Sequence, residues 1–324
     1  MSRKLKLGLF GLGHLGKIHL NCIKNIPEIE LVGCYDIQQD PGKEICAEQG
    51  VKFFENPDEL MDQSEALDIV TPTISHYDIA SKALSRGKHC FIEKPVTEHS
   101  REAIILENLA NEHYLKVQIG HVERYNPGFL AVKNSIHHPR FIEAHRLATF
   151  NPRGTDVSVV HDLMIHDLDL ISVIAQSEPV DIRANGVNIV SPKADICNAR
   201  IEFKNGLVAN VTASRISMKQ MRKIRIFQDD AYISLDLLTK EAQIISLLSE
   251  YQDQTIELDT YMGKRYVSLQ TPEITPVNAI LEEIKSFAKS IVMNLPVEVN
   301  LTDGIRALKL VEAISQQIEA AHER

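Results

Sequence analysis

Short apolar runs alternate with helix-like patterns through the first third of the chain. Each run is predicted to be a buried strand, and the stretch after it carries apolar residues at helical spacing. The predicted strands cover residues 6–10, 30–35, 66–70, 88–92 and 115–119, and the predicted helices cover 17–26, 75–86 and 100–112. Repeated strand–helix–strand units predict an α/β domain with a doubly wound parallel sheet, and such sheets bind ligands at the carboxyl ends of their strands.

The pattern changes from about Phe141, where strand-like runs follow one another directly. These runs cover residues 141–150, 180–190, 199–203, 207–213, 223–227, 231–235 and 242–248. Asn205-Gly206 between two of them is a strong hairpin signal. Helices are predicted at 158–175, 279–293 and 303–319. We therefore expect a first domain at 1–122 and, at 123–324, an α+β domain with a large, mostly antiparallel open sheet, whose last helix packs back on the first domain.

Length, charge and cysteine content narrow the class of protein. A chain of 324 residues favours two domains, and a formal net charge of −9 argues against nucleic-acid binding, which needs a basic surface. The five cysteines form no C-x-x-C pair, which favours buried thiols in a reduced, cytoplasmic setting over disulfides or a zinc site. We find no targeting segment and no apolar run of membrane-spanning length, so no membrane association is expected.

A glycine-rich turn follows the first predicted strand. Its G-x-G-x-x-G pattern stands between a strand and a helix, where a dinucleotide-binding turn requires it. Gly11 permits the tight turn, Gly13 lets the backbone approach a pyrophosphate, and Gly16 lets the helix pack closely on the strand. His14 and Leu15 begin the helix, whose free N–H groups attract a phosphate. The first domain is therefore predicted to be a Rossmann domain.

Asp36 ends the second predicted strand, about 20 residues after Gly16. A carboxylate at this point accepts hydrogen bonds from the adenosine ribose of NAD and repels the 2′-phosphate of NADP. Ile37, Gln38 and Gln39 follow and supply no arginine. The sequence favours NAD over NADP as the cofactor, although a turn acid with no such role is the alternative.

Two further strand ends carry residues suited to chemistry. Thr71-Pro72 follows one predicted strand and Glu93-Lys94-Pro95 follows another, so both lie at the ligand-binding edge of the sheet. Pro95 keeps Lys94 out of helical backbone angles. A lysine fixed beside the cofactor can act on a substrate hydroxyl or stabilise the oxygen that forms. The alternative is a solvated surface lysine.

A second candidate group lies on the predicted helix 158–175. Asp162 and His166 are four residues apart and share one face of an α-helix. A carboxylate beside a histidine orients the ring and raises its basicity, which suits the ring to take a hydroxyl proton. The alternatives are a solvated polar face and a metal site. His161 and His166 are five apart, roughly 140° around an α-helix, so no metal is expected.

Together these motifs resemble the Gfo/Idh/MocA family, named for glucose–fructose oxidoreductase and inositol dehydrogenase. The resemblance rests on the glycine run at 11–16, Asp36, Thr71-Pro72 with His76, Glu93-Lys94-Pro95, and Asp162 with His166. It implies that Lys94, Asp162 and His166 form the catalytic group. It also implies a homodimer or homotetramer, because the family commonly buries the open sheet face against another subunit.

The same resemblance implies roles at the cofactor. Glu93 would face the nicotinamide ribose beside Lys94. Thr71, Pro72 and His76 would line the cofactor pocket.

A narrower resemblance lies in the segments 120–127 and 162–169. Both are similar to the UDP-N-acetylglucosamine 3-dehydrogenase-like members of the family, which oxidise a sugar C3 hydroxyl to a ketone. The substrate-binding residues that this implies are Glu123, Arg124, Tyr125, Asn126 and Arg153. The two arginines would pair with a diphosphate, and the tyrosine would stack or hydrogen-bond. The alternative is that E-R-Y-N-P is a hinge turn between domains.

The sequence as a whole predicts an NAD(P)-dependent dehydrogenase that oxidises a secondary hydroxyl of a sugar, with C3 of a nucleotide sugar favoured. His166, held by Asp162, would take the proton at the cleft between the domains while Lys94 stabilises the oxyanion, and the sequence leaves open which of Lys94 and His166 is the base. One alternative is a reductase of another carbonyl, an imine or a tetrapyrrole. Another is a non-catalytic redox sensor that binds NAD and a partner protein.

Overall fold

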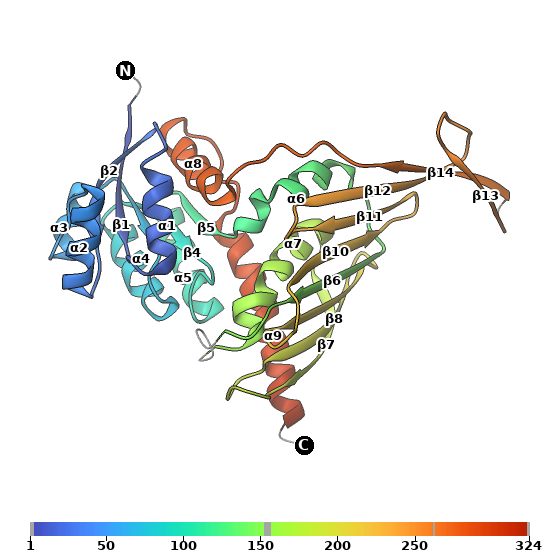
Figure 1. Ribbon diagram of the computed structural model, residues 1–324. Helices are drawn as coiled ribbons and strands as arrows, with labels where there is room; N and C mark the ends of the chain where they lie inside the picture. The colour runs from blue at the N-terminus through green and yellow to red at the C-terminus, as the bar shows by residue number, and fades with distance from the viewer. Residues whose placement is uncertain (1–2, 152–156, 262, 323–324) are drawn as a thin grey trace. The chain divides into compact units, whose positions relative to one another are not determined.

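The computed structural model describes residues 3–151, 157–261 and 263–322 of the chain. Two compact units make up these residues (Figure 1). The first unit contains Met1–Val122 and Asn278–Lys309, and the second contains Glu123–Val277 and Leu310–Arg324. The predicted boundary after residue 122 coincides with the end of the first segment, and the chain returns to the first unit at Asn278.

The first unit is built on a parallel sheet, which confirms the doubly wound α/β prediction. Its described strands run in the order β2-β1-β3-β4-β5. Their bounds are β1 Leu5–Phe10, β2 Ile29–Tyr35, β3 Ala66–Ile69, β4 His89–Glu93 and β5 Val117–Gly120. The helices are α1 His14–Ile23, α2 Gln39–Gln49, α3 Pro57–Gln63, α4 His76–Ser85, α5 Ser100–Glu112 and α8 Ala279–Val292, and α9 Leu301–His322 is divided between the units.

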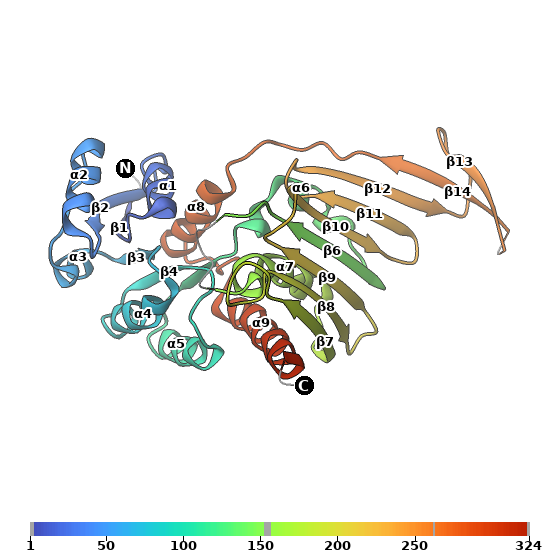
Figure 2. The ribbon, with the colours of Figure 1, turned by 60° about the horizontal axis from the view of Figure 1, so that its bottom comes forward.

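Alternation along β1 explains how the helices cover this sheet. Leu5, Leu7 and Leu9 share a buried core with residues of α1 and α8, and α8 lies beside α1 in Figures 1 and 2. Gly8 points to the other face, where an added Cβ would lie 3.0 Å from a side-chain carbon of Leu60 in α3. Right-handed crossovers place α4 and α5 on that second face as well. Both faces are therefore covered, and the strand ends remain as the place for a ligand.

The sequence pattern predicts no helix at α2 or α3. α2 has few apolar residues and carries Pro41-Gly42 in its first turns, so its pattern is not that of an amphipathic helix. Asn56 caps α3 by accepting the N–H of Asp58, which is the signal that the prediction overlooked. Ser75 stands at the N-cap position of α4 but makes no side-chain cap, and its hydroxyl donates instead to the carbonyl oxygen of Pro72 in the turn before α4.

The second unit contains a long sheet whose described strands run in the order β13-β14-β12-β11-β10-β6-β9-β8-β7 (Figure 2). All neighbours are antiparallel except β6 and β9, which confirms the predicted mostly antiparallel sheet. The bounds are β6 Phe141–Leu147, β7 Pro179–Val187, β8 Ile196–Phe203, β9 Val208–Ser214, β10 Met221–Phe227, β11 Ala231–Asp236, β12 Glu241–Leu248, β13 Ile256–Thr260 and β14 Gly263–Gln270.

The turn between β8 and β9 is the hairpin predicted from Asn205-Gly206, with Gly206 at a φ of +88°. The strands β13 and β14 were not predicted. They are largely exposed and rich in charged residues, so they lack the apolar alternation of a half-buried strand.

One face of the second sheet is covered by helices of the same unit. These are α6 (Pro127–Val132), α7 (Ile165–Ala175) and the second half of α9, whose Ile318 lies against Gly186 of β7. The alternate residues Ile142, Ala144 and Arg146 of β6 are buried on this face. An arginine at a core position needs a carboxylate partner, and α7 supplies one.

The predicted helix 158–175 is not α-helical throughout. Its first turn, Val160–Met164, is a π-helix, in which the N–H of Ile165 bonds to the carbonyl oxygen of Val160. The assumption of 3.6 residues per turn was therefore wrong at this point. In a π-turn, residues five apart are brought closer around the axis, so the angle predicted between His161 and His166 does not hold.

The five cysteines are all free and buried, as predicted for thiols without disulfides. In the part of the chain that the structure describes, no helix combines the length and apolar character needed to cross a membrane.

Candidate functional site

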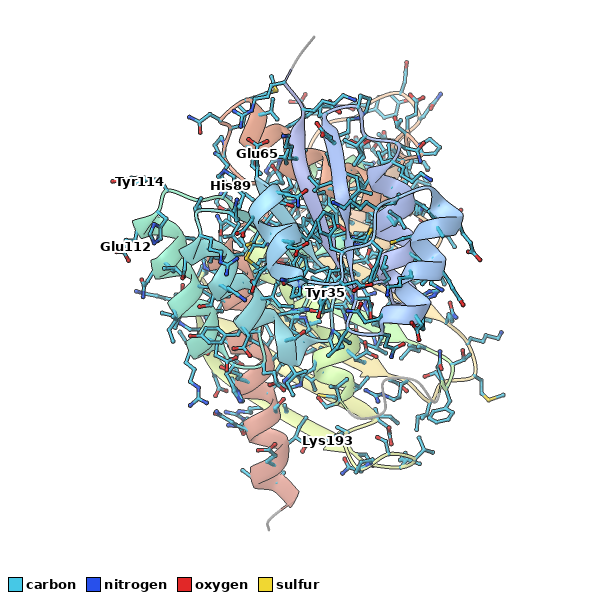
Figure 3. The ribbon with its side chains drawn as sticks, turned by 90° about the vertical axis from the view of Figure 1, so that its left-hand side faces the viewer. Tyr35, Glu65, His89, Glu112, Tyr114 and Lys193 are labelled. Atoms are coloured by element: carbon cyan, nitrogen blue, oxygen red, sulfur yellow. The ribbon has the colours of Figure 1, made fainter. Side chains whose placement is uncertain are left out.

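A pocket of about 600 Å³ opens at the carboxyl ends of β1, β2 and β3. Its lining includes residues 10–13, 35–38 and 70–72. Tyr35, labelled in Figure 3, lies at the end of β2 in this lining. Apolar side chains from the surrounding helices and loops complete the wall, namely Ile37, Ile45, Met61, Ile74 and Ile79. An apolar wall beside exposed backbone suits a ligand with a flat base and a sugar–phosphate chain.

The glycines of the first turn each have a separate structural reason. Gly11 has a φ of +99°, and an added Cβ would lie 2.6 Å from the carbonyl oxygen of Val70. At Gly16 a Cβ would lie 2.1 Å from the carbonyl oxygen of Gly11, so only glycine lets α1 pack there. At Gly13 a Cβ would meet no described atom within 4 Å, although Gly13 lines the pocket. The space that Gly13 leaves open fits an approaching pyrophosphate.

Helix α1 supplies the donors for such a group. It begins at His14, with Leu15 next, and the first N–H groups of an α-helix have no intrahelical acceptor. Its N-cap residue is Gly13, which has no side chain to occupy these donors. The residues present therefore fit the diphosphate of a dinucleotide cofactor.

Asp36 joins the glycine-rich turn to the end of β2. Its carboxylate accepts the N–H of Leu12 at 2.6 Å and the N–H of Gln38 at 2.8 Å. Asp58 also lines the pocket, and Lys82, a cation in the lining, pairs with it at 2.5 Å. The pocket is therefore not a basic one, and a ribose hydroxyl suits it better than a second phosphate.

Thr71 and Pro72 line the pocket, whereas His76 lies behind them. His76 is buried, and its two ring nitrogens lie 2.8 Å from the carbonyl oxygen of Thr71 and 2.9 Å from that of Pro95. Burial lowers the pKa of His76 below its ordinary value. His76 thus connects the turn after β3 to the turn after β4, where the Lys94–Pro95 peptide bond is cis.

Glu93 is buried at the end of β4, and its carboxylate accepts the backbone N–H of Lys94 at 3.1 Å. Three charged residues near Glu93 escaped the sequence prediction, namely His19, Asp68 and Glu283. A signal for two of them was present, because Asp68 interrupts an apolar strand and Glu283 falls on the apolar face of an amphipathic helix.

Asp162 and His166 lie in the second unit, on the π-turn and the first turn of α7. Both are partly exposed, while Val160, Met164 and Leu168 are fully buried and form the apolar side of this helical segment. π-Turns occur often at functional sites, and this one carries Asp162 and is followed directly by the turn that carries His166.

The acidic residues next to His166 form buried ion pairs. Asp169 takes a bidentate pair with Arg124, with both N–O distances at 2.7 Å. Asp167 takes a bidentate pair with Arg146 at 2.8 and 3.0 Å, and Glu123 lies 2.9 Å from the same guanidinium. Burial alone would lower the pKa of Arg146, but the two carboxylates outweigh it and raise the pKa above its ordinary value.

These contacts bear on the predicted substrate residues. Asn126 caps α6 by accepting the N–H of Gly128 at 3.0 Å and donates to Glu123 at 2.9 Å, and Tyr125 is buried. The contacts agree with a structural role for the E-R-Y-N segment, and substrate binding by Glu123, Arg124, Tyr125 and Asn126 stays a prediction. The predicted residue Arg153 lies outside the described residues.

The loop before β8 supports the start of the π-turn. Asp195 accepts hydrogen bonds from the hydroxyl of Ser191 and from the three successive N–H groups of 189–191, and together these donors lower its pKa to about 2 although its burial opposes the change. The neighbouring carbonyl of Ala194 accepts the N–H of Val159 at 2.9 Å, and the carbonyl of Asp195 accepts that of Arg215 at 3.0 Å.

The chain matches two family models. Residues 5–121 match an oxidoreductase family with an NAD-binding Rossmann fold, and residues 130–234 match the GFO/IDH/MocA C-terminal domain. These matches cover more than half of the chain.

Known dehydrogenases are similar to this chain, one of them over nearly its whole length. UDP-N-acetylglucosamine 3-dehydrogenase from Acidithiobacillus ferrooxidans is 35% identical over 321 residues, which cover 99% of each chain. A solved structure of that enzyme covers 98% of each chain with a TM-score of 0.89 at 34% identity. Glucose-6-phosphate 3-dehydrogenase from Bacillus subtilis is 28% identical over 242 residues, 66% of this chain and 69% of the other.

Proposed function

Because this chain belongs to the Gfo/Idh/MocA family of NAD-binding oxidoreductases, we propose that it is a dehydrogenase that oxidises the C3 hydroxyl of a nucleotide sugar. The observation that carries the proposal is the full-length similarity to an enzyme named for oxidation of UDP-N-acetylglucosamine at position 3. A second relative is named for oxidation of glucose 6-phosphate at the same position. Sugar C3 is therefore the favoured site of oxidation.

The pocket supports NAD as the cofactor. Gly13 and the start of α1 would hold the diphosphate, and Asp36 would accept the ribose hydroxyls. When bound, NAD supplies the nicotinamide ring that accepts a hydride. The acidic lining at Asp36 and Asp58 opposes the extra phosphate of NADP.

The chain's own residues would handle the proton and the developing charge. Asp162 orients the ring of His166, and His166 takes the hydroxyl proton. The ammonium group of Lys94 stabilises the oxygen as negative charge develops on it. Exchange of these two roles, with Lys94 as the base, is the alternative within the same proposal. The predicted homodimer or homotetramer remains a prediction, which light scattering would test.

The decisive experiment mixes the purified protein with NAD and, in turn, UDP-N-acetylglucosamine, UDP-glucose, glucose 6-phosphate and inositol. We expect NADH absorbance to rise with the first sugar, and mass spectrometry to find a product lighter by a pair of hydrogen atoms. Lys94→Met is the matched control, which should bind NAD and lack turnover. Tight NAD binding without turnover of any sugar would instead favour a redox sensor.

A further inference from the structure

A cluster of buried titratable residues lies beside the Lys94 turn in the first unit. It consists of His19 from α1, Asp68 from β3, Glu93 from β4 and Glu283 from α8, and is called the buried acidic cluster below. His19, Asp68 and Glu283 have no solvent exposure, and Glu93 is 7% exposed. These elements are distant in the sequence but pack together within one unit (Figure 1).

Two members of the cluster are paired through His19. Its Nδ1 lies 2.9 Å from a carboxylate oxygen of Asp68, and its Nε2 lies 3.2 Å from a carboxylate oxygen of Glu93. An imidazole that faces a carboxylate with each nitrogen is best satisfied when both nitrogens carry protons. Burial opposes this charge, but the carboxylates of Asp68 and Glu93 outweigh it, so the pKa of His19 is well above its ordinary value.

Glu283 is in a different situation. Among the residues that the structure describes, neither of its carboxyl oxygens has a hydrogen-bond partner. Gln118 donates to the backbone carbonyl of Glu283 at 2.7 Å and does not satisfy the side chain. One carboxyl oxygen of Glu283, one of Glu93 and a ring nitrogen of His19 all lie within 4.8 Å of one another.

The charges in this place do not balance if every carboxyl group is ionised. A charged His19 offsets one carboxylate, and Asp68 and Glu93 already supply two. An ionised Glu283 would add a further negative charge in an interior that also contains Phe91 and Phe287. Burial of an unpaired carboxylate is far more costly than burial of the neutral acid.

We propose that Glu283 is a neutral carboxylic acid that holds a proton toward Glu93 and thereby acts as a positioning residue for the Glu93–Lys94 turn. An ionised carboxylate can only accept hydrogen bonds, whereas the protonated acid is also a donor. A carboxylate oxygen of Glu93 is an acceptor within 4.8 Å of Glu283. Rotation of a side chain would bring the two groups into direct hydrogen-bond contact, and one water molecule would bridge them without such a rotation.

This proton completes the confinement of Glu93. Nε2 of His19 lies at an ion-pair distance of 3.2 Å from one carboxylate oxygen, without hydrogen-bond geometry, and the other oxygen accepts the N–H of Lys94 at 3.1 Å. An added Cβ at Gly120 would lie 2.6 Å from the carboxylate, so the backbone of β5 closes a further side. Glu283 closes the side toward α8. The orientation of Glu93, and with it the Lys94 turn, then depends on a residue that touches neither cofactor nor substrate.

The pH dependence of folding separates Glu283 from its neighbours. Burial raises its pKa well above the ordinary 4.5, so the neutral acid stabilises the fold at low pH and this contribution is lost as the pH rises through the raised pKa. The groups that face it are His19 and Cys22 on α1, Asp68 on β3 and Glu93 on β4. These groups remain in a Glu283→Gln variant, so the difference from the original protein reports Glu283 together with its electrostatic coupling to them.

Infrared spectroscopy tests the protonation directly. The protein should show the carbonyl stretch of a protonated carboxylic acid at neutral pH, and that band should be absent from Glu283→Gln. Glu282→Gln is the matched control, because Glu282 is the neighbouring residue on α8, pairs with Lys285 and is 36% exposed. Its band pattern should match that of the original protein. An unchanged band in Glu283→Gln would overturn the proposal, as would a stoichiometric metal ion that is lost in this variant.

The positioning role rests on the proposed function, so it has separate readouts. Glu283→Gln keeps a neutral donor and should preserve NAD affinity and turnover, whereas Glu283→Leu should lower kcat by about tenfold through misplacement of the turn. If Glu283→Leu does not fold, two measurements on Glu283→Gln still decide whether Glu283 is protonated. They are the loss of the infrared band and a weaker dependence of the unfolding free energy on pH than in the original protein. A folded Glu283→Leu variant with the same kcat as the original protein would overturn the positioning role. If no sugar is turned over at all, NAD affinity of the two variants supplies the same comparison, and only the proposed function fails.

Discussion

The two units solve the burial of charge in opposite ways. In the second unit Arg146 pairs with Asp167 and Glu123, and Arg124 pairs with Asp169, so each of these three buried carboxylates has a guanidinium partner. In the first unit, one imidazole faces an excess of carboxyl groups, and we infer that a proton makes up the difference. Guanidinium pairs hold their geometry at any physiological pH, whereas a cluster that depends on a proton is sensitive to pH. The buried acidic cluster of the first unit contains Glu93, the predicted nicotinamide-facing residue. The ion pairs of the second unit involve Asp167 and Asp169, which lie on the same helix as His166.

Removing Arg146 should have the largest effect on this comparison. In Arg146→Met, Asp167 and Glu123 would be left buried without a cation, which costs about 3–5 kcal/mol of unfolding free energy. Urea unfolding measures the loss, with Arg183→Met as the exposed control. A loss below that of the control would show that the pairs do not hold the second unit together.

The one-to-one pair of Arg124 and Asp169 allows a rescue experiment. Arg124→Met alone leaves one buried carboxylate unpaired, whereas Arg124→Met with Asp169→Leu removes both charges. We expect the double variant to recover about 2 kcal/mol or more of unfolding free energy relative to the single variant, because a buried ion pair is often replaceable by apolar residues. Additive losses in a double-mutant cycle would contradict this interpretation of the pair.

Asp195 shows a third solution, in which the Ser191 hydroxyl and backbone N–H groups replace the cation. Its pKa is lowered to about 2 from the ordinary 3.8, so its contribution is present above the ordinary value and is lost as the pH falls toward 2. Asp195→Asn should cost about 2 kcal/mol near neutral pH and progressively less in acid. Thermal unfolding across this range, with the half-exposed Asp181→Asn as control, checks both the size and the sign. An equal loss at every pH would rule out the carboxylate as the cause.

The sequence predicts features that depend on local geometry. The glycine turn, the parallel sheet and the Asn205-Gly206 hairpin follow from spacing and backbone preference, and the structure contains them all.

Features that depend on distant partners escaped the prediction. Nothing in the E-R-Y-N segment indicates that Arg124 meets Asp169, 45 residues away, so its arginine was assigned to a diphosphate. The buried acidic cluster requires the return of α8 to the first unit, which brings Glu283 to Glu93. The π-turn at Val160–Met164 also gives no signal in the periodicity, because its neighbours continue as an α-helix.

The most direct test of the central claim follows the hydrogen at sugar C3. UDP-N-acetylglucosamine that carries deuterium at C3 is incubated with the protein and NAD, and the NADH that forms is examined by mass spectrometry. The proposed function predicts deuterium in the NADH, and Lys94→Met should abolish it. Tight binding of NAD and the sugar nucleotide without deuterium transfer would contradict the assignment of this chain as a C3 dehydrogenase.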